Sequence, residues 1–463
     1  MEQFERDAYD ELIDRFRRMI RENKSSFFDS EEMEIIIEDL LFNFDFESCD
    51  KALDHAIATF PQLPIFYILK AKKYRMEIEF EKAEAELKWV EQRFPPSSEL
   101  YKERYVLNSI LNDNPKNYLL LLKAEKMDPI DPETQFLLSF EYLKQDELQK
   151  ATRCISLAIR EEEEYAEKLF HFSYYFESHG KYVDAHLFYT NLTEVFPLLK
   201  GAWFGLGLAY SWLNNYEEAI SAYQYALSID DDIPTAHFNI GNSYYDLEDY
   251  DSALKHYGIA LELDPADYNS IACVGDCYYK MGQLDMAKDC YRQSLEINPE
   301  NVDALYGMIN LTKDGNNTAT IRNYISKALA ITPENFDLLF IALDLYNDEQ
   351  CEEKLIEIFE QSLTLSENKA LHFESFAIYC CVYQHFEEAL LIFDRYHTCP
   401  DISQIVDYYT AAMHYLSGNI ENGNRFLCNA LMINFDDYRA FLRLDPQLEE
   451  IPEIINLIEI FRT

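Results

Sequence analysis

A period of 34 residues runs through most of this 463-residue chain. It is clearest between Lys200 and Asn301, where three copies follow one another without a gap. A fixed period of this length means that each copy is one supersecondary unit, which buries its apolar face only against its neighbours. The residues that return every 34 positions are Gly207, Gly241, Gly275; Ala219, Ala253, Ala287; Tyr210, Tyr244, Tyr278; and Tyr223, Tyr257, Tyr291.

Within one copy, a large residue comes early, an aliphatic residue precedes the glycine, and a small residue lies in the second half. The first clear copy shows the full order: Trp203, Leu206, Gly207, Tyr210, Ala219, Tyr223 and Ala226. This order resembles the tetratricopeptide repeat (TPR) family. The resemblance implies an all-α fold, namely a right-handed superhelical α-solenoid of stacked antiparallel helix pairs, with a helix A and a helix B in every repeat.

The same register extends in both directions from the three clear copies. Further copies are expected to start near Pro64 and Pro132 upstream, and near Phe336, Ala370 and Gln404 downstream. We expect about twelve repeats over residues 33–435, of which only the first, near Met33, is out of phase, by about three residues. The proline that ends the motif returns at multiples of 34 residues: Pro95, Pro129, Pro197, Pro265, Pro299 and Pro333.

Elementary packing explains these positions. Small residues such as Gly207 and Ala219 let helices A and B approach closely, and large ones such as Tyr210 and Tyr223 fill the space between neighbouring repeats. Turn residues such as Asn214 separate the two helices. A proline after helix B ends that helix, because proline lacks the amide donor and clashes with the preceding turn.

Two segments lie outside the period and are expected to cover the apolar ends of the array. Residues 1–32 predict an amphipathic leading or capping helix, since Leu12, Ile13 and Phe16 share one face. A role of this helix at a membrane surface is the alternative. Residues 436–463 carry many apolar side chains and predict a C-terminal capping helix segment.

The chain has 40 basic and 84 acidic residues, so its formal net charge is −44. Such a charge repels phosphate backbones and argues against nucleic-acid binding. It favours either a basic partner, attracted over long range, or solubility alone. No run of 18 apolar residues occurs and the N-terminal residues are charged, so no membrane association and a cytoplasmic location are expected.

No cofactor or metal site is expected. The 10 cysteines lack paired CxxC spacing, so the pair Cys273 and Cys277 is expected to serve packing. Three histidines of one repeat, His171, His179 and His186, lack a matching cysteine or carboxylate pattern and are a weak metal signal.

The family resemblance implies that helix A lines a concave groove. When the motif glycine is counted as position eight, positions two, five, nine and twelve face this groove. They are rich in aromatic and amide side chains, which suit an extended peptide or a helix as ligand. Trp212 lies one place beyond the set. The predicted partner-binding residues are Phe136, Phe140, Phe170, Tyr174, Phe204, Trp212, Phe238, Asn242, Tyr245, Asp276, Tyr279, Tyr306 and Asn310.

Related proteins that clamp a C-terminal carboxylate use lysine at position five with asparagine at position nine. Here these places hold Phe238 with Asn242, so acidic chaperone tails are disfavoured as ligands. Lys72 and Arg75 form a small basic patch that is expected to accept an acidic segment.

The sequence therefore predicts a non-enzymatic scaffold or adaptor that binds a peptide or helical segment of a protein partner in the groove. A purely structural or self-associating repeat protein is the alternative. An enzyme-associated array that recruits substrate is less favoured, because the period leaves room for no separate catalytic domain or phosphate-binding loop.

Overall fold

The computed structural model describes residues 3–22, 26–111, 114–312, 318–332, 335–338, 341, 356–357, 359–360, 363–364, 369–396 and 403–462. Over these residues the regular structure is helical and no strand occurs, so the predicted all-α class is confirmed. The helices form two compact units, Met1–Asp231 and Asp232–Thr463, which are called unit 1 and unit 2. The predicted limits of the repeat array, residues 33 and 435, remain a prediction.

The helices of unit 1 are α1 (Gln3–Glu22), α2 (Ser30–Phe42), α3 (Phe46–Thr59), α4 (Ile65–Met76), α5 (Phe80–Arg93), α6 (Ser98–Leu111), α7 (Tyr118–Met127), α8 (Pro132–Lys144), α9 (Leu148–Glu161), α10 (Glu164–Glu167), α11 (Phe170–Ser178), α12 (Tyr182–Val195), α13 (Lys200–Trp212) and α14 (Tyr216–Ile229).

The helices of unit 2 are α15 (Pro234–Asp246), α16 (Tyr250–Leu263), α17 (Tyr268–Lys280), α18 (Leu284–Ile297), α19 (Val302–Thr312), α20 (Thr318–Ile331), α23 (Lys369–Tyr383), α24 (Phe386–Tyr396), α25 (Ser403–Leu416), α26 (Ile420–Ile433), α27 (Tyr438–Leu442) and α28 (Pro452–Phe461), with the short 3₁₀ turns η1 (Phe435–Asp437) and η2 (Pro446–Glu450).

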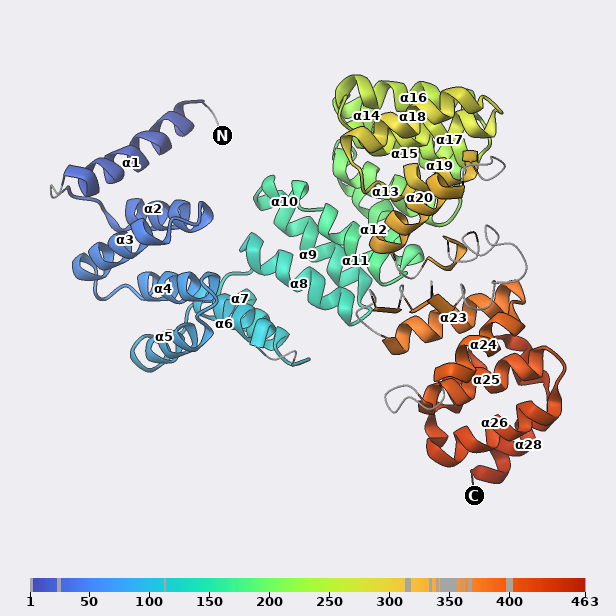
Figure 1. The fold of residues 1–463 in the computed structure, drawn as a ribbon. Helices are drawn as coiled ribbons and strands as arrows, with labels where there is room; N and C mark the ends of the chain where they lie inside the picture. Colours follow the sequence, from blue (N-terminus) through green and yellow to red (C-terminus); the bar gives the residue numbers. More distant parts are fainter. Residues whose placement is uncertain are drawn as a thin grey trace. The chain divides into compact units, whose positions relative to one another are not determined.

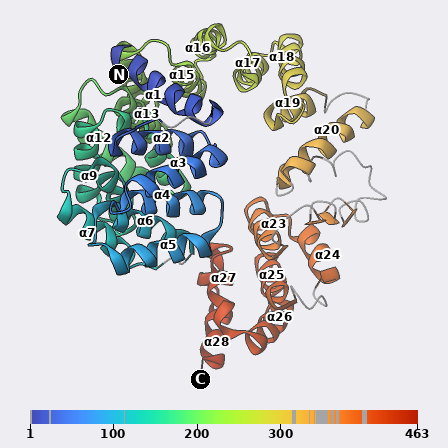
Figure 2. The ribbon, with the colours of Figure 1, turned by 90° about the vertical axis from the view of Figure 1, so that its left-hand side faces the viewer.

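Neighbouring helices pack in pairs in chain order, such as α4 with α5, α8 with α9 and α13 with α14 in unit 1, and α15 with α16 and α17 with α18 in unit 2. The first helix of each pair is helix A of the predicted repeat, and the second is helix B. Figures 1 and 2 show α2 to α5 as stacked layers in chain order. Successive A helices also pack on each other, as α11 on α13 and α17 on α19, so each unit has a face built from A helices.

The turn between helices A and B keeps the 34-residue period more strictly than any side chain does. Every residue with positive φ in the described part of the chain lies 34 residues, or a multiple of 34, from the others. They are Phe44, Ile78, Asp146, Gly180, Asn214, Glu248, Gly282, Gln384 and Gly418. Isoleucine strongly disfavours the left-handed region that Ile78 occupies, so the packing of the flanking helices must impose this turn.

The turn at Phe44 corrects one prediction. The first repeat was expected to be out of phase by about three residues, but α2 ends 34 residues before α4, and Phe44 lies 34 residues before Ile78. The first repeat is therefore in register. The repeat predicted to start near Phe336 falls largely on residues outside the described part of the chain.

The ends of helices follow from their sequence. Asp249 precedes α16, and its Oδ1 atom accepts a hydrogen bond from the amide of Ser252 at 3.1 Å, which satisfies a donor left free at the helix start. Helix α16 ends at Leu263, two residues before Pro265. Proline could not continue the helix there.

A tyrosine of helix B lies against the glycine of helix A in the same repeat. The tyrosines Tyr223, Tyr257 and Tyr291 are almost fully buried. A Cβ atom on Gly241 would lie 2.6 Å from Cε1 of Tyr257, closer than van der Waals contact allows. The ring therefore occupies the space where any other residue would carry its side chain. This confirms the prediction that the small motif residues permit close approach of the two helices.

One tyrosine also joins neighbouring repeats. Tyr291 of α18 lies against Gly275 of α17 in its own repeat and against Gly307 of α19 in the next repeat. A single ring thus packs between three helices. This arrangement matches the prediction that large residues fill the space between neighbouring repeats.

The apolar face of α1 covers the start of unit 1. Ile13 and Phe16 are buried, and the rings of Phe16 and Phe28 meet edge to face with centroids 5.8 Å apart. The guanidinium carbon of Arg15 lies 4.6 Å from the ring centre of Phe28. At the other terminus Phe441, Leu448 and Ile454 are buried. Among the described helices, none is both long enough and apolar enough to cross a bilayer.

The contact between glycine and tyrosine predicts opposite effects for two Gly→Ala substitutions. Gly241→Ala should lower the free energy of unfolding by about 1–3 kcal/mol, because the new methyl group overlaps the buried ring of Tyr257. Gly258→Ala in α16, where a Cβ would meet no atom within 4 Å, should raise it by up to about 1 kcal/mol through helix propensity. Chemical denaturation followed by circular dichroism measures both, and equal effects would contradict the packing described.

Candidate functional site: the face of the A helices

The predicted partner-binding residues lie on the A helices of both units. In unit 1 they lie on α8, α11 and α13, and in unit 2 on α15, α17 and α19. Their environments differ widely. Phe170 and Tyr174 are 62% and 72% exposed, Tyr279 is 36% exposed, and the others are half-buried.

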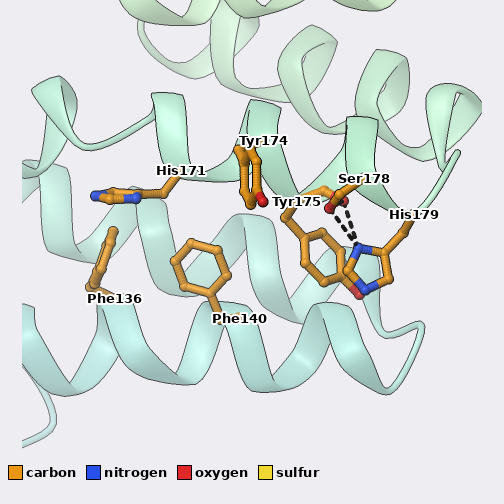
Figure 3. Close-up of a pocket in the computed structure, with 7 residues that line it drawn as sticks. All are labelled: Phe136, Phe140, His171, Tyr174, Tyr175, Ser178 and His179. Carbon is orange, nitrogen blue, oxygen red and sulfur yellow. Dashed lines mark hydrogen bonds between the residues drawn. The ribbon is translucent and has the colours of Figure 1, made fainter. Parts of the chain in front are cut away.

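Three of the predicted residues meet in a pocket of about 290 Å³ between α8 and α11. Figure 3 shows Phe136 and Phe140 rising from α8 toward side chains that descend from α11. Tyr174 stands on α11 opposite Phe140. The remaining lining residues are His171, Tyr175, Ser178 and His179.

Stacked rings form the floor of this pocket. Phe140 lies parallel to the buried Phe172, with ring centroids 4.3 Å apart, and Phe172 stacks in turn on Phe188 of α12 at 5.1 Å. Phe136 meets Phe172 edge to face at 5.8 Å. Because core residues fix the positions of these rings, the floor of the pocket is preformed. Its side chains therefore lose little conformational entropy on binding.

The pocket residues that the sequence did not predict follow a simple rule. Ser173 occupies position eight of its repeat, so His171 and Tyr175 stand at positions six and ten. The ring of Phe136, at position five, meets that of His171 at 6.3 Å, and the ring of Phe140, at position nine, meets that of Tyr175 at 6.4 Å. Positions five and nine of one A helix thus face positions six and ten of the next.

Polar atoms at the rim of the pocket are largely engaged. Nδ1 of His179 lies 2.9 Å from the carbonyl oxygen of Tyr175 and 3.1 Å from Oγ of Ser178. Since the carbonyl oxygen only accepts, Nδ1 donates to it. His186, which was considered with these two histidines, packs instead against Tyr210 at 4.9 Å. In the described part of the chain, no group of three or more histidine, cysteine or acidic residues is placed to hold a metal ion.

The residues that line the pocket include no lysine, arginine, aspartate or glutamate. Burial, with a smaller effect of Lys168, lowers the pKa of His171, which keeps its imidazole uncharged at neutral pH. Lys168 pairs with Glu164 at 2.7 Å, and Lys181 pairs with Asp146 at 2.6 Å. The chemistry of this pocket therefore suits an apolar or aromatic side chain.

Phe204 and Trp212 do not join this pocket. Phe204 packs against Tyr223 with centroids 5.5 Å apart, and Trp212 packs against Tyr182 at 5.5 Å. Both are half-buried and contribute to packing within unit 1.

The predicted residues of unit 2 also take part in packing. Phe238 lies 5.8 Å from the ring of Tyr257, and Tyr245 lies 5.5 Å from that of Tyr250. Tyr306 packs at the edge of the core near α19 and α20, and its hydroxyl group bonds to the side chain of Asn310.

Asn242 and Asp276 share one structural role at position nine of successive A helices. The hydroxyl of Tyr257 donates to Oδ1 of Asn242 at 2.7 Å, and that of Tyr291 donates to Oδ1 of Asp276 at 2.6 Å. Burial, assisted by the nearby Asp303, raises the pKa of Asp276 to about 6, although the tyrosine hydrogen bond acts in the opposite direction.

One of the two residues of the predicted basic patch at Lys72 and Arg75 forms an ion pair within the fold. Arg75 donates from Nε to Oε1 of Glu103 at 2.6 Å and from Nη2 to Oε2 at 3.0 Å. Glu103 is buried and lies on α6, the next A helix. This ion pair joins two repeats and engages Arg75, so the acceptance of an acidic segment by Lys72 and Arg75 stays a prediction.

Comparison with known proteins places the three clear repeats in a recognised family. A family model described as "Tetratricopeptide repeat" matches residues 234–267 and 273–301, and a second, "TPR repeat", matches residues 207–247. No curated protein matches the chain.

Several solved structures resemble the chain. A tetratricopeptide repeat protein from Parabacteroides merdae is 19% identical, over 60% of this chain and 97% of its own, with a TM-score of 0.35. TTC0263 from Thermus thermophilus is 20% identical, over 39% and 98%, with a TM-score of 0.31. YrrB, "a TPR protein with an unusual peptide-binding site", is 19% identical, over 40% and 96%, with a TM-score of 0.29.

The substitution Asp276→Asn tests whether the pKa of the Asp276 carboxyl group, at position nine of α17, is raised in the folded protein. The variant keeps an oxygen acceptor for Tyr291, as Asn242 does for Tyr257. Because the pKa of Asp276 is raised in the folded protein from the ordinary 3.8 to about 6, its favourable contribution is complete below pH 4 and is lost as the pH rises through about 6.

The Asp276→Asn variant should therefore be more stable than the wild type by about 2–3 kcal/mol at pH 7, and about equally stable near pH 4. Urea denaturation at both pH values measures the difference. A stability difference that does not change with pH would show that the carboxyl group titrates normally.

Proposed function

Because this chain is a tetratricopeptide repeat protein, we propose that it is a non-enzymatic scaffold or adaptor that holds an extended or helical segment of a protein partner against its A helices. The observation that carries the proposal is the preformed aromatic pocket between α8 and α11 in unit 1. Proteins built from such repeats commonly bind protein segments on surfaces of this kind.

The chemistry of the pocket defines the anchor that it accepts. Phe136, Phe140 and Tyr174 present ring surfaces, and the charged groups at the rim are paired. An aliphatic or aromatic side chain of the partner would displace water from these rings and bury apolar area. Such a central anchor supplies most of the binding free energy in many interfaces.

Exposed aromatic side chains extend the same surface. Phe170 and Tyr174 are four residues apart on α11, so they lie on one side of that helix. Large side chains that remain mostly exposed beside an apolar pocket are typical of interaction surfaces. They contribute little to the packing of unit 1 and are available to a partner.

The non-enzymatic part of the proposal rests on the 34-residue period, which leaves no separate catalytic domain in the sequence. The two units are proposed to act as parts of one interaction scaffold.

The double variant Phe170→Ala with Tyr174→Ala should weaken partner binding at least tenfold, because it removes the exposed rings and one wall of the pocket. Its thermal midpoint should stay within about 2 °C of the wild type, since exposed substitutions away from packed sites change stability little. Affinity capture from native extract finds the partner, and titration of the purified partner then gives the dissociation constants.

A matched control exists on the other side of the repeat. Val183→Ala with Leu187→Ala removes two residues that are 61% and 47% exposed on the B helix α12. This variant should bind the partner as the wild type does. Equal loss in both variants, or loss only in the control, would refute binding at the A helices. Light scattering of all three proteins would reveal whether the ligand is a second copy of the chain.

A further inference from the structure

Asp276 carries a charge that its structural role does not need. The hydroxyl of Tyr291 requires only an oxygen acceptor, and the preceding repeat meets the same need with the neutral amide of Asn242. An ionised carboxylate in this half-buried place is unfavourable, as its raised pKa shows. The fold therefore does not require the negative charge of Asp276.

No cation within the described structure neutralises this charge by contact. Lys280, one turn further along α17, attracts the carboxylate at longer range, while Asp303 of α19 repels it. Among the described residues, no basic side chain forms an ion pair with Asp276. The pair Asp276 and Asp303 therefore leaves net negative charge at this place on the A helices of unit 2.

Tyrosine side chains lie near the carboxylate of Asp276. Tyr245 of α15 and Tyr291 of α18 interact electrostatically with Asp276. Tyr279 follows Asp276 by three residues on α17, so the two lie on the same side of that helix. The faces of such rings carry partial negative charge and attract a cation. A carboxylate among tyrosine rings suits the planar guanidinium of arginine, which forms charge-assisted hydrogen bonds and also stacks on rings.

We propose that Asp276, with Tyr245 and Tyr279, binds an arginine side chain of the partner segment. This site rests on the proposed function and specifies the chemistry of the partner in unit 2. The net charge of −44 favours the approach of a basic segment over long range. The Asp276 carboxylate fixes the position of one basic residue of that segment.

The site depends on pH because only the ionised carboxylate attracts arginine. The groups that face Asp276 are Cys273, Cys277 and Lys280 on its own helix, Tyr245 on α15, Tyr257 on α16, Tyr291 on α18 and Asp303 on α19. Burial raises the pKa of both thiols and of both Tyr245 and Tyr291, so these groups stay neutral at pH 7. Asp276 itself, with a pKa of about 6, changes charge between pH 7 and pH 5.

The test uses a fluorescent tetra-arginine peptide and the full-length chain at physiological salt. At pH 7, Asp276→Asn should weaken binding of the peptide about three- to tenfold. The control Glu296→Gln removes an equal charge from an exposed position on the B helix α18 and should weaken binding less than about twofold. At pH 5 the wild type and Asp276→Asn should bind within about twofold of each other.

The outcomes separate this site from the proposed function. If Asp276→Asn binds the peptide as tightly as Glu296→Gln does at pH 7, or if its deficit is unchanged at pH 5, the arginine site is refuted. The proposed function stands in that case if Phe170→Ala with Tyr174→Ala still loses the native partner. Conversely, if the native partner binds Phe170→Ala with Tyr174→Ala as tightly as it binds the wild type, the anchor pocket is refuted. The peptide titration still tests the arginine site at Asp276 in that case.

Discussion

The contact between a buried tyrosine of helix B and a glycine of helix A is the interaction on which the rest of the structure depends. It brings the helices of a pair together, and at Tyr291 it also reaches the next repeat through Gly307. Because one repeat cannot bury its own apolar face, such rings help to join a helix pair to its neighbour, as Tyr291 does between α17, α18 and α19. The same tyrosines orient Asn242 and Asp276 on the A helices through their hydroxyl groups.

Much of the fold could be predicted from the sequence, because the residues that enforce close packing are chemically distinctive. The period, the helix pairs and the role of glycine followed from Gly207, Gly241, Gly275 and their tyrosines. The register of the first repeat did not, since Phe44 and Ile78 occupy left-handed turns where glycine or asparagine is expected. At these positions tertiary packing outweighs local preference, and the sequence carries no signal of it.

The candidate site was predictable only in part. Phe136, Phe140 and Tyr174, which positions five and nine indicated, line the pocket, but so do His171 and Tyr175 from positions six and ten of the next helix. Partner binding by the predicted residues stays a prediction. Such pairing depends on how consecutive A helices are rotated, which a single repeat pattern does not specify. Similarly, the ion pair between Arg75 and Glu103 links residues 28 positions apart and could not be inferred from one repeat.

The central claim, that partners bind on the A helices, is tested most directly by site-specific photo-crosslinking. A photoreactive phenylalanine analogue placed at Tyr174 on α11 and, in a separate protein, at Val183 on α12 reports which face touches a ligand in native extract. Binding on the A helices should give a discrete protein adduct from position 174 that is absent from position 183. Adducts from position 183 alone would contradict it and would place the interaction surface on the B helices.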